Sequence, residues 1–250
     1  MNARKSGAFH GQVVLITGGN SGIGLAYVRE FARAGAQVVA CGRDARKLAE
    51  LKVTLPDVDV VSCDLTQPAD VDLLVKGVAN RHGRLDCLVL NAGVMEQPDF
   101  AAGEVDEAAL RREIEINLIA PMILTHRLLP LLRRAGHGMI VVVTSGYALL
   151  PPRRAPTYAA TKAGLRAFAI GLRHQLKPQG LRVVEVLPPL VDTPATAAIH
   201  KPKISTAKVA ADTLAGLIAG RDEIAIGQVR LLPTLMRLAP GLARRLVAQS

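Results

Sequence analysis

Short apolar, β-branched runs alternate along the chain with longer segments in which apolar residues recur at helical spacing. The runs have no alternate polar face, which is typical of parallel strands covered by helices on both sides. The pattern predicts strands at Val13–Ile16, Gln37–Cys41, Val58–Ser62, Cys87–Leu90, Met139–Val143, Val183–Leu187 and Ile224–Ile226. It predicts helices near Ile23–Ala34, Ala45–Val53, Val71–Arg81, Glu107–Arg133, Ala159–Leu176 and Lys208–Ala219. Strict βαβ alternation predicts an α/β fold, a doubly wound parallel sheet of seven strands in a single domain.

In such a sheet, ligands bind outside the carboxyl ends of the strands. The first predicted strand is followed by Thr17-Gly18-Gly19-Asn20-Ser21-Gly22-Ile23-Gly24 and then by a helix. Gly18 and Gly22 allow backbone conformations and close approaches that a Cβ would block. The helix N-terminus attracts a pyrophosphate, and Gly24 lets the helix lie close on the sheet. The spacing predicts a dinucleotide site, with a plain tight turn as the alternative.

The second predicted strand ends at Gly42 and Arg43. NAD-binding proteins of this fold usually place an acidic residue here for the ribose 2′-hydroxyl, whereas an arginine accommodates the 2′-phosphate of NADP. We therefore expect NADP rather than NAD, the alternative being that Arg43 is an exposed turn residue. Asp44 is better placed to cap the next helix. After the third and fourth strands we expect further cofactor contacts from Asp64-Leu65 and Asn91-Ala92-Gly93.

The spacing of four polar residues predicts a site for proton transfer. Tyr158 and Lys162 are four residues apart on a predicted helix and share one face. A nearby ammonium lowers the pKa of a phenol, so that the pair exchanges protons more readily. Ser145 directly follows the fifth strand, where its hydroxyl would hold a substrate oxygen. Asn117 precedes Pro121 by four residues, and we expect the missing proline N–H to free the Asn117 carbonyl for a water linked to Lys162. The alternative for Asn117 is a polar helix residue beside a proline kink.

In order and spacing these motifs resemble those of the short-chain dehydrogenase/reductase family over roughly residues 10 to 230. The resemblance implies that Tyr158 is the acid/base, Ser145 orients the carbonyl and Asn117 supports the relay water. It also implies that Lys162 holds the nicotinamide ribose and tunes Tyr158. Hydride would pass between nicotinamide C4 and the carbon of a carbonyl or secondary alcohol. The implied cofactor contacts are Gly18, Asn20, Ser21, Gly22, Ile23, Gly24, Arg43, Asp64, Leu65, Asn91, Ala92, Gly93, Tyr158, Lys162, Pro188, Val191 and Thr193.

Two features depart from the family pattern. Pro188-Pro189 stands where the family usually has Pro-Gly after the sixth strand, although Val191 and Thr193 keep their expected contacts. Asn20 and Ser21 are not basic, so the expected NADP preference rests on Arg43. The stretch after the sixth strand, together with 172–176, is similar to the oxidoreductases associated with teichoic-acid D-alanylation genes.

Toward the C-terminus the sequence indicates a substrate side. We expect a lid over about residues 190–205, small and apolar in content, and pocket contacts from Met95 and Tyr147. The alternative for both side chains is plain packing. The tail, 228–250, carries prolines and arginines at intervals of seven and should form short helical pieces. A lid or subunit contact is its favoured role, and contact with anionic lipid is the alternative.

Composition narrows the class of protein. Half of the 250 residues are hydrophobic, which excludes a disordered chain, and a net charge of +10 without a nucleic-acid motif indicates a solvated basic surface. Cys41, Cys63 and Cys87 have no metal-ligand spacing and are expected as reduced core thiols. No window has about 18 uninterrupted apolar residues, and we expect no signal peptide, because the first apolar run, Val13–Ile16, is too short for one. We expect no metal and a cytoplasmic location. The family resemblance implies a homodimer or homotetramer whose interface is formed by the helices near 107–133 and 159–176.

Two hypotheses remain. The favoured one is an NADP(H)-dependent reductase or dehydrogenase acting on a small-molecule carbonyl or alcohol. The other is a cofactor-binding regulator or scaffold without turnover. An epimerase of the longer sugar-nucleotide branch is disfavoured, because 250 residues leave no room for its larger C-terminal domain.

Overall fold

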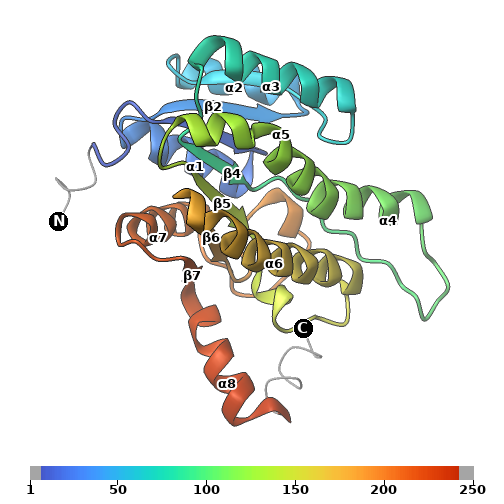
Figure 1. Ribbon diagram of the computed structural model, residues 1–250. Helices are drawn as coiled ribbons and strands as arrows, with labels where there is room; N and C mark the ends of the chain where they lie inside the picture. The colour runs from blue at the N-terminus through green and yellow to red at the C-terminus, as the bar shows by residue number, and fades with distance from the viewer. Residues whose placement is uncertain (1–6, 242–250) are drawn as a thin grey trace.

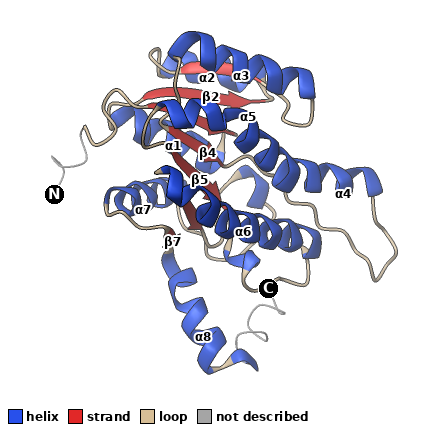
Figure 2. Cartoon of the chain, in the orientation of Figure 1, coloured by secondary structure: helices blue, strands red, loops and turns tan. Residues whose placement is uncertain are grey.

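The computed structural model describes residues 7–241, which form a parallel sheet between two layers of helices (Figures 1 and 2). The strand order is β3-β2-β1-β4-β5-β6-β7. The strands are β1 (Val13–Thr17), β2 (Gln37–Gly42), β3 (Asp59–Ser62), β4 (Cys87–Leu90), β5 (Met139–Val143), β6 (Arg182–Leu187) and β7 (Glu223–Ala225). The expected doubly wound fold is confirmed. Because β1 pairs with both β2 and β4, the strand order reverses at β1, which is where such sheets bind ligands.

The helices are α1 (Gly22–Arg33), α2 (Ala45–Thr54), α3 (Pro68–His82), α4 (Glu107–Ile114), α5 (Ala120–Arg134), α6 (Pro156–Leu176), α7 (Thr206–Ile218) and α8 (Leu232–Leu238). Apolar side chains of α1 and α7 pack on one face of the sheet, around Tyr27 and Phe31, in a core to which α2 adds Leu51. Those of α3, α5 and α6 pack on the other face, around Leu74, Leu128 and Leu165. Few large aromatic side chains are needed, because branched aliphatic residues fill both layers.

The segment expected as one helix over 107–133 is interrupted. After α4 the chain forms a π turn at Glu115–Ile119, where the Ala120 N–H donates to the Glu115 carbonyl, and α5 follows. Pro121 has no N–H to give to the Asn117 carbonyl, so the regular α-helical ladder cannot continue here. Among the described residues, Glu107–Arg134 is the one helical stretch long and apolar enough to cross a membrane. Its α5 part is a core helix, since several of its leucines are buried against the sheet.

The C-terminal part leaves the body of the molecule. Gly227, with a φ of +58°, turns the chain after β7 into a short 3₁₀ helix, and α8 then projects from the sheet edge (Figure 1). None of the α8 side chains is buried. The expectation of short helical pieces is confirmed for residues 228–241, and the rest of the expected tail, 242–250, lies outside the described residues.

The three cysteines are buried and free. Cys41 is the next-to-last residue of β2, Cys87 begins β4 and Cys63 directly follows β3. Burial raises the pKa of each thiol, that of Cys63 to about 12, so the thiolate form is scarce at neutral pH. Their environment therefore matches the expected core thiols.

Candidate active site

The turn after β1 depends on glycine. Gly18 and Gly22 have φ values of +66° and +53°, the left-handed region that L side chains rarely adopt. Gly24, in the first turn of α1, is required for a different reason. A Cβ there would collide with the Gly18 carbonyl oxygen and would lie 2.6 Å from the Asn91 Nδ2 atom. Gly24 thus lets α1 approach the turn itself, as well as the sheet beneath it.

Thr17 ties this turn to the end of β4, and the sequence argument had not singled out its side chain. Its buried hydroxyl oxygen accepts hydrogen bonds from the backbone N–H groups of Asn91, at 2.9 Å, and Ala92, at 3.0 Å. The same hydroxyl donates to the Val89 carbonyl, and the Asn91 amide donates to the Thr17 carbonyl at 2.9 Å. These bonds hold the two cofactor-binding turns in register. In the sequence, the available signal for Thr17 was a threonine directly after the predicted buried strand Val13–Ile16.

At the end of β2, a side chain in place of Gly42 would have to displace the side chain of Asn20. A Cβ on Gly42 would lie 2.6 Å from the Asn20 side-chain oxygen, so Asn20 fills the place of the usual carboxylate. Arg43 is exposed beside it. Asp44 caps α2 as expected, accepting from the Lys47 N–H at 3.1 Å.

Asp64 lies close to Arg43 at the same edge of the sheet. Its carboxylate accepts hydrogen bonds from the Thr66 N–H and hydroxyl, at 3.0 and 2.9 Å. Although burial opposes the shift, these bonds and the charge of Arg43 lower the pKa of the Asp64 carboxyl. The carboxylate is therefore ionised at neutral pH, next to a guanidinium that faces solvent.

Ser145 and Tyr158 come from separate elements and meet at the carboxyl edge of the sheet. Ser145 follows β5, and its side-chain oxygen accepts from the Tyr147 N–H at 3.1 Å. Tyr158 stands in the first turn of α6, hydrogen-bonded to Ser145, and its ring meets that of Tyr147 edge to face at 6.3 Å between centroids. The expected pairing of hydroxyl and phenol is present.

Lys162 is buried one turn further along α6. Its Nζ donates to the Val143 carbonyl at 3.0 Å and lies 5.7 Å from the centroid of the Tyr158 ring. Burial lowers the pKa of Lys162 to about 8, and burial raises the pKa of Tyr158 to about 12, opposed by the bond to Ser145. The expected lowering of the phenol pKa is therefore wrong, because burial, the largest cause, raises the pKa of Tyr158.

Asn117 is fully buried in the π turn, and its side chain is engaged with the segment after β4. Its Oδ1 accepts from the Val94 N–H at 2.9 Å, and its Nδ2 donates to the Val94 carbonyl at 2.8 Å and to the Thr161 hydroxyl at 3.2 Å. A Cβ on Gly93 would lie 3.1 Å from the Asn117 oxygen and 3.5 Å from the Lys162 Nζ. Gly93 is thus the point at which the amide and the ammonium converge.

Glu113 is a charged residue that the sequence argument missed. It lies on α4, completely buried, where it accepts from the Thr157 hydroxyl at 2.5 Å and from the Glu96 N–H at 2.9 Å. Thr157 is the residue before Tyr158, and the charge of Glu113 favours the protonated form of Lys162. Burial raises the pKa of Glu113 itself. A carboxylate on a polar helix gave no sequence signal, since its burial depends on how α4 meets α6.

One cavity of about 670 Å³ joins most of these groups. Its lining includes the expected residues Gly18, Ser21, Gly22, Ile23, Asn91, Ala92, Gly93, Met95, Ser145, Tyr147, Tyr158, Lys162, Pro188, Val191 and Thr193. The expected residues outside this lining are Asn20, Gly24, Arg43, Asp64, Leu65 and Asn117. Gly24 and Asn117 act from beneath the cavity, by the contacts described above. The other four lie at or next to the ends of β2 and β3, along the same edge of the sheet.

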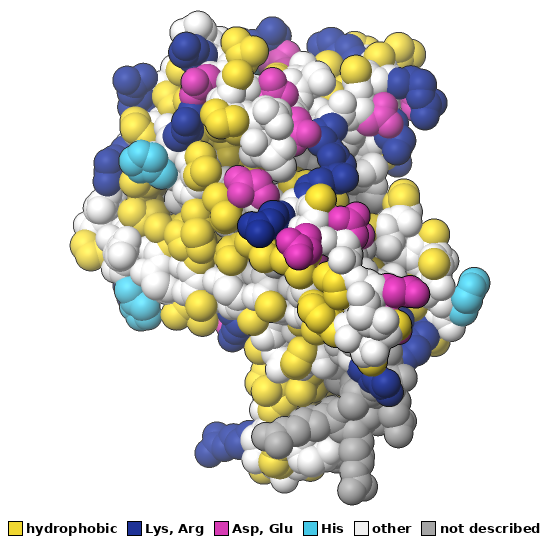
Figure 3. Space-filling view, turned by 90° about the vertical axis from the view of Figure 1, so that its right-hand side faces the viewer, with side chains coloured by type: hydrophobic (Ala, Val, Ile, Leu, Met, Phe, Trp, Pro, Cys, Tyr) yellow, Lys and Arg dark blue, Asp and Glu magenta, His cyan; other side chains and the backbone are white. Residues whose placement is uncertain are grey.

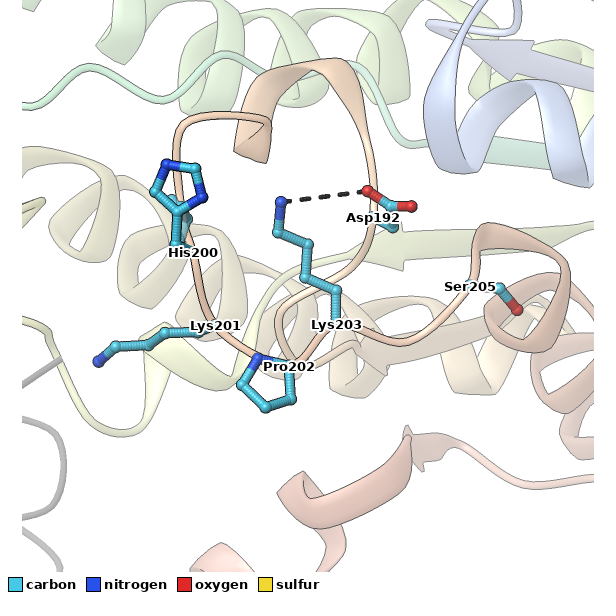
Figure 4. A pocket seen from close by; sticks show the side chains of 7 residues that line it. Asp192, His200, Lys201, Pro202, Lys203 and Ser205 are labelled. Atoms are coloured by element: carbon cyan, nitrogen blue, oxygen red, sulfur yellow. Dashed lines mark ion pairs between the residues drawn. The ribbon is translucent and has the colours of Figure 1, made fainter.

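The segment 190–205 forms one side of the cavity, and hydrogen bonds within the segment join its beginning to its end. The Asp192 N–H donates to the Ile204 carbonyl at 2.9 Å, and Lys203 Nζ donates to the Thr196 carbonyl at 2.7 Å. Figure 4 shows Lys203 reaching toward Asp192 while Lys201 points away from them. The polar side chains of segment 190–205 therefore do not form a second binding site.

Comparison with known proteins agrees with this geometry. The family model described as short chain dehydrogenase matches residues 12–203. The chain is 39% identical over 180 residues to the uncharacterized oxidoreductase DltE of Bacillus subtilis, covering 72% of this chain and 71% of that protein. It is 35% identical over 186 residues to the L-fucose dehydrogenase of Bos taurus, covering 74% and 68%.

Solved structures show the same likeness. A short chain dehydrogenase from Burkholderia cenocepacia, crystallised in complex with NADP, superposes with a TM-score of 0.84 at 26% identity, covering 96% of this chain and 98% of that one. The similarity to DltE also confirms the expected likeness to the D-alanylation branch. With the family model covering most of the chain and the fold shared throughout, the chain belongs to the short chain dehydrogenase family and is an oxidoreductase.

Proposed function

We propose that this chain is an NADP(H)-dependent oxidoreductase that interconverts a carbonyl compound and the corresponding alcohol, with Tyr158 as the acid/base. The observation that carries the proposal is the shared cavity. The glycine turn, the Asn91–Gly93 turn, Ser145, Tyr158 and Lys162 all line it. Cofactor-binding backbone and proton-transferring side chains thus face one space.

The residues fit a dinucleotide. The Gly18–Gly22 turn and the N-terminus of α1 offer backbone N–H groups to a pyrophosphate. Asn91, Ala92 and Gly93 provide close backbone approach, and Val191 and Thr193 line the cavity where the carboxamide is expected. When bound, NADP(H) supplies or accepts hydride at nicotinamide C4. Segment 190–205 covers the site as a lid in this proposal.

The proton is handled by this chain's own residues. In the reductive direction the Tyr158 hydroxyl donates its proton to the substrate oxygen, which the Ser145 hydroxyl holds in place by a hydrogen bond. The Lys162 ammonium, which would hold the nicotinamide ribose of a bound cofactor, stabilises the resulting phenolate. Asn117 holds the Val94 backbone beside Lys162 and supports the relay water. With the phenol protonated at neutral pH, the resting protein is prepared for carbonyl reduction.

The preference for NADP over NAD rests on Gly42, Asn20 and Arg43. Asn20 occupies the space of the usual acidic side chain, and exposed Arg43 offers a bidentate partner to a 2′-phosphate. We expect Arg43→Asp to weaken NADPH binding by at least tenfold and to leave NADH binding unchanged or improved, measured by fluorescence titration. Arg46→Asp, an exposed charge change three residues away, is the control. An unchanged NADPH-to-NADH ratio in Arg43→Asp would contradict the cofactor proposal.

The activity is tested by isotope transfer. NADPH carrying deuterium at C4 is incubated with the protein and a panel of ketones and aldehydes. We expect deuterium on the carbinol carbon of the product, detected by mass spectrometry, from one face of the nicotinamide only. Cofactor binding without deuterium transfer to any carbonyl would support a binding protein instead.

We also propose a homo-oligomer through the π turn, α5 and α6. Ile119, Ile123 and Ile170 expose more than a third of their surface on these elements. Figure 3 shows apolar side chains gathered in a band between charged ones on one face of the molecule. An Ile123→Asp variant that sediments with the same mass as the unaltered protein would count against this interface.

A further inference from the structure

We propose that the substrate carries an extended hydrocarbon chain, held between α8 and the loop after Ser145, with its carbonyl or alcohol at Tyr158. This inference rests on the proposed function and names its substrate class. The starting point is the part of the cavity lining that belongs neither to the cofactor turns nor to the tetrad. Most of its side chains are apolar: Met95, Leu150, Pro189, Leu190, Pro202, Val229, Leu231, Leu232 and Leu235; the polar ones are Thr144, Tyr147, Thr196, Lys201 and Gln228.

Val229 fixes the C-terminal segment over the reacting groups. It is buried, and a Cβ on Gly146 would lie 2.9 Å from its Cγ2 atom. Gly146 follows Ser145 directly, so the chain from Val229 onward begins beside the Ser145 loop. From there Leu231, Leu232 and Leu235 continue the cavity wall along α8. The apolar lining therefore runs from the proton-transferring side chains to the projecting helix.

Among the described residues, 7–241, no side chain completely covers the leucines of α8 or Leu231 just before it. Leu231 exposes 69% of its surface although it lines the cavity, and Leu232 and Leu235 are half-buried. Figure 3 shows apolar side chains on the part of the molecule that projects below the body. Apolar surface exposed at the mouth of a cavity gains free energy when an apolar ligand covers it. A hydrocarbon chain that starts at Tyr158 meets this surface without leaving the cavity.

The polar side chains of the same region do not form a site for a polyhydroxylated substrate. The Thr144 hydroxyl donates to the Glu185 carboxylate and the Thr196 hydroxyl to the Val191 carbonyl. The Tyr147 hydroxyl accepts a hydrogen bond from Arg154 at 2.7 Å, and Lys201 and Gln228 are exposed to solvent. A sugar buried here would leave several hydroxyl groups without partners, which disfavours binding. The lining thus favours a hydrocarbon chain over a sugar such as the one named for the L-fucose dehydrogenases.

The test is a homologous series of 2-alkanones, from 2-butanone to 2-decanone, reduced with NADPH. We expect kcat/KM to rise about two- to fourfold per added methylene until the chain reaches α8. Leu235→Asp should flatten this dependence. Leu238→Asp is the matched control, because Leu238 lies on the same helix but outside the cavity lining. Neither change threatens folding, since no α8 side chain is buried.

A second measurement separates this inference from the proposed function. Binding of 2-alkanols to the Tyr158→Phe protein with NADP is followed by calorimetry. Affinity that grows with chain length, without turnover by the unaltered enzyme, would support the hydrocarbon site and remove the proposed activity. Turnover that is independent of chain length, or fastest with free sugars, would overturn the hydrocarbon site and leave the activity standing. Absence of both binding and turnover, or a change of oligomer mass in Leu235→Asp alone, would also overturn it.

Discussion

The two sides of the cavity are built in different ways. The cofactor side consists of turns at the ends of β1 and β4, held by glycine conformations and by the buried Thr17 hydroxyl, whose hydrogen bonds join both turns. The opposite side consists of side chains from the segment 190–205 and from α8, a helix with no buried residue. Under the proposed function, the comparison teaches that the cofactor is bound mainly by rigid backbone, with Val191 and Thr193 as added side-chain contacts. The substrate would be selected by replaceable side chains on less embedded segments.

The largest expected effect comes from adding a methyl group to the cofactor side. Gly24→Ala places a Cβ against the Gly18 carbonyl, so the turn or α1 must shift. A misplacement of about 1 Å costs an enzyme on the order of a hundredfold in rate, and we take the same factor for cofactor binding. We expect NADPH affinity, measured by fluorescence titration, to fall by that factor.

Gly77→Ala, in α3, is the matched control for this prediction. A Cβ there meets nothing within 4 Å, and alanine is the better helix former. This variant should bind NADPH normally and melt slightly higher. Equal NADPH affinity in the Gly24 and Gly77 variants would remove the distinction drawn between a rigid cofactor side and its surroundings.

A smaller effect is expected at Glu113, which lies under the reacting groups. Glu113→Gln keeps the shape but removes the charge that favours protonated Lys162 and weakens the bond to Thr157. We expect kcat to fall about tenfold, the size of one charged hydrogen bond. KM should change little, because Glu113 touches neither ligand in this account and acts as a positioning residue. Glu107→Gln, exposed on the same helix, should match the unaltered protein.

The pH dependence of the reaction rates provides a second test of the role of Glu113. Lys162 loses its proton as pH rises through about 8, so carbonyl reduction should decline above that pH. Since the Glu113 carboxylate raises the pKa of Lys162, its removal in Glu113→Gln should move the decline to lower pH. Alcohol oxidation needs phenolate, and the raised pKa of Tyr158 predicts that its rate increases with pH across the neutral range. A decline at the same pH in both proteins would show that Glu113 is purely structural.

The sequence predicted the cofactor side of the cavity better than it predicted the side formed by α8. The strands, the left-handed Gly18 and Gly22, the Asp44 cap and the meeting of Ser145 with Tyr158 were all predictable, because each depends on local conformation and on the shared edge of a parallel sheet. The π turn at 115–119 was foreseen only as a disruption by Pro121. The position of α8 was not predictable, since few contacts fix it to the body.

Electrostatics was the part that sequence reasoning judged wrongly. Spacing placed an ammonium near a phenol and suggested a lowered pKa for Tyr158. The spacing contained no information on burial, which is the largest cause of the pKa shift of both side chains. Burial raises the pKa of Tyr158 and lowers the pKa of Lys162, so each shift is the reverse of what would make the phenol easier to ionise. The sequence did not indicate Glu113 either, because its carboxylate is buried only by the packing of α4 against α6.

The most direct test is the rate of a single turnover of bound NADPH with saturating ketone, compared between the unaltered protein and Tyr158→Phe. We predict a loss of about 10³-fold in that rate with unchanged NADPH affinity, because the phenylalanine keeps the ring and removes only the proton donor. A Tyr158→Phe protein that oxidises its bound NADPH at the original rate would show that the phenol is not the acid of this enzyme.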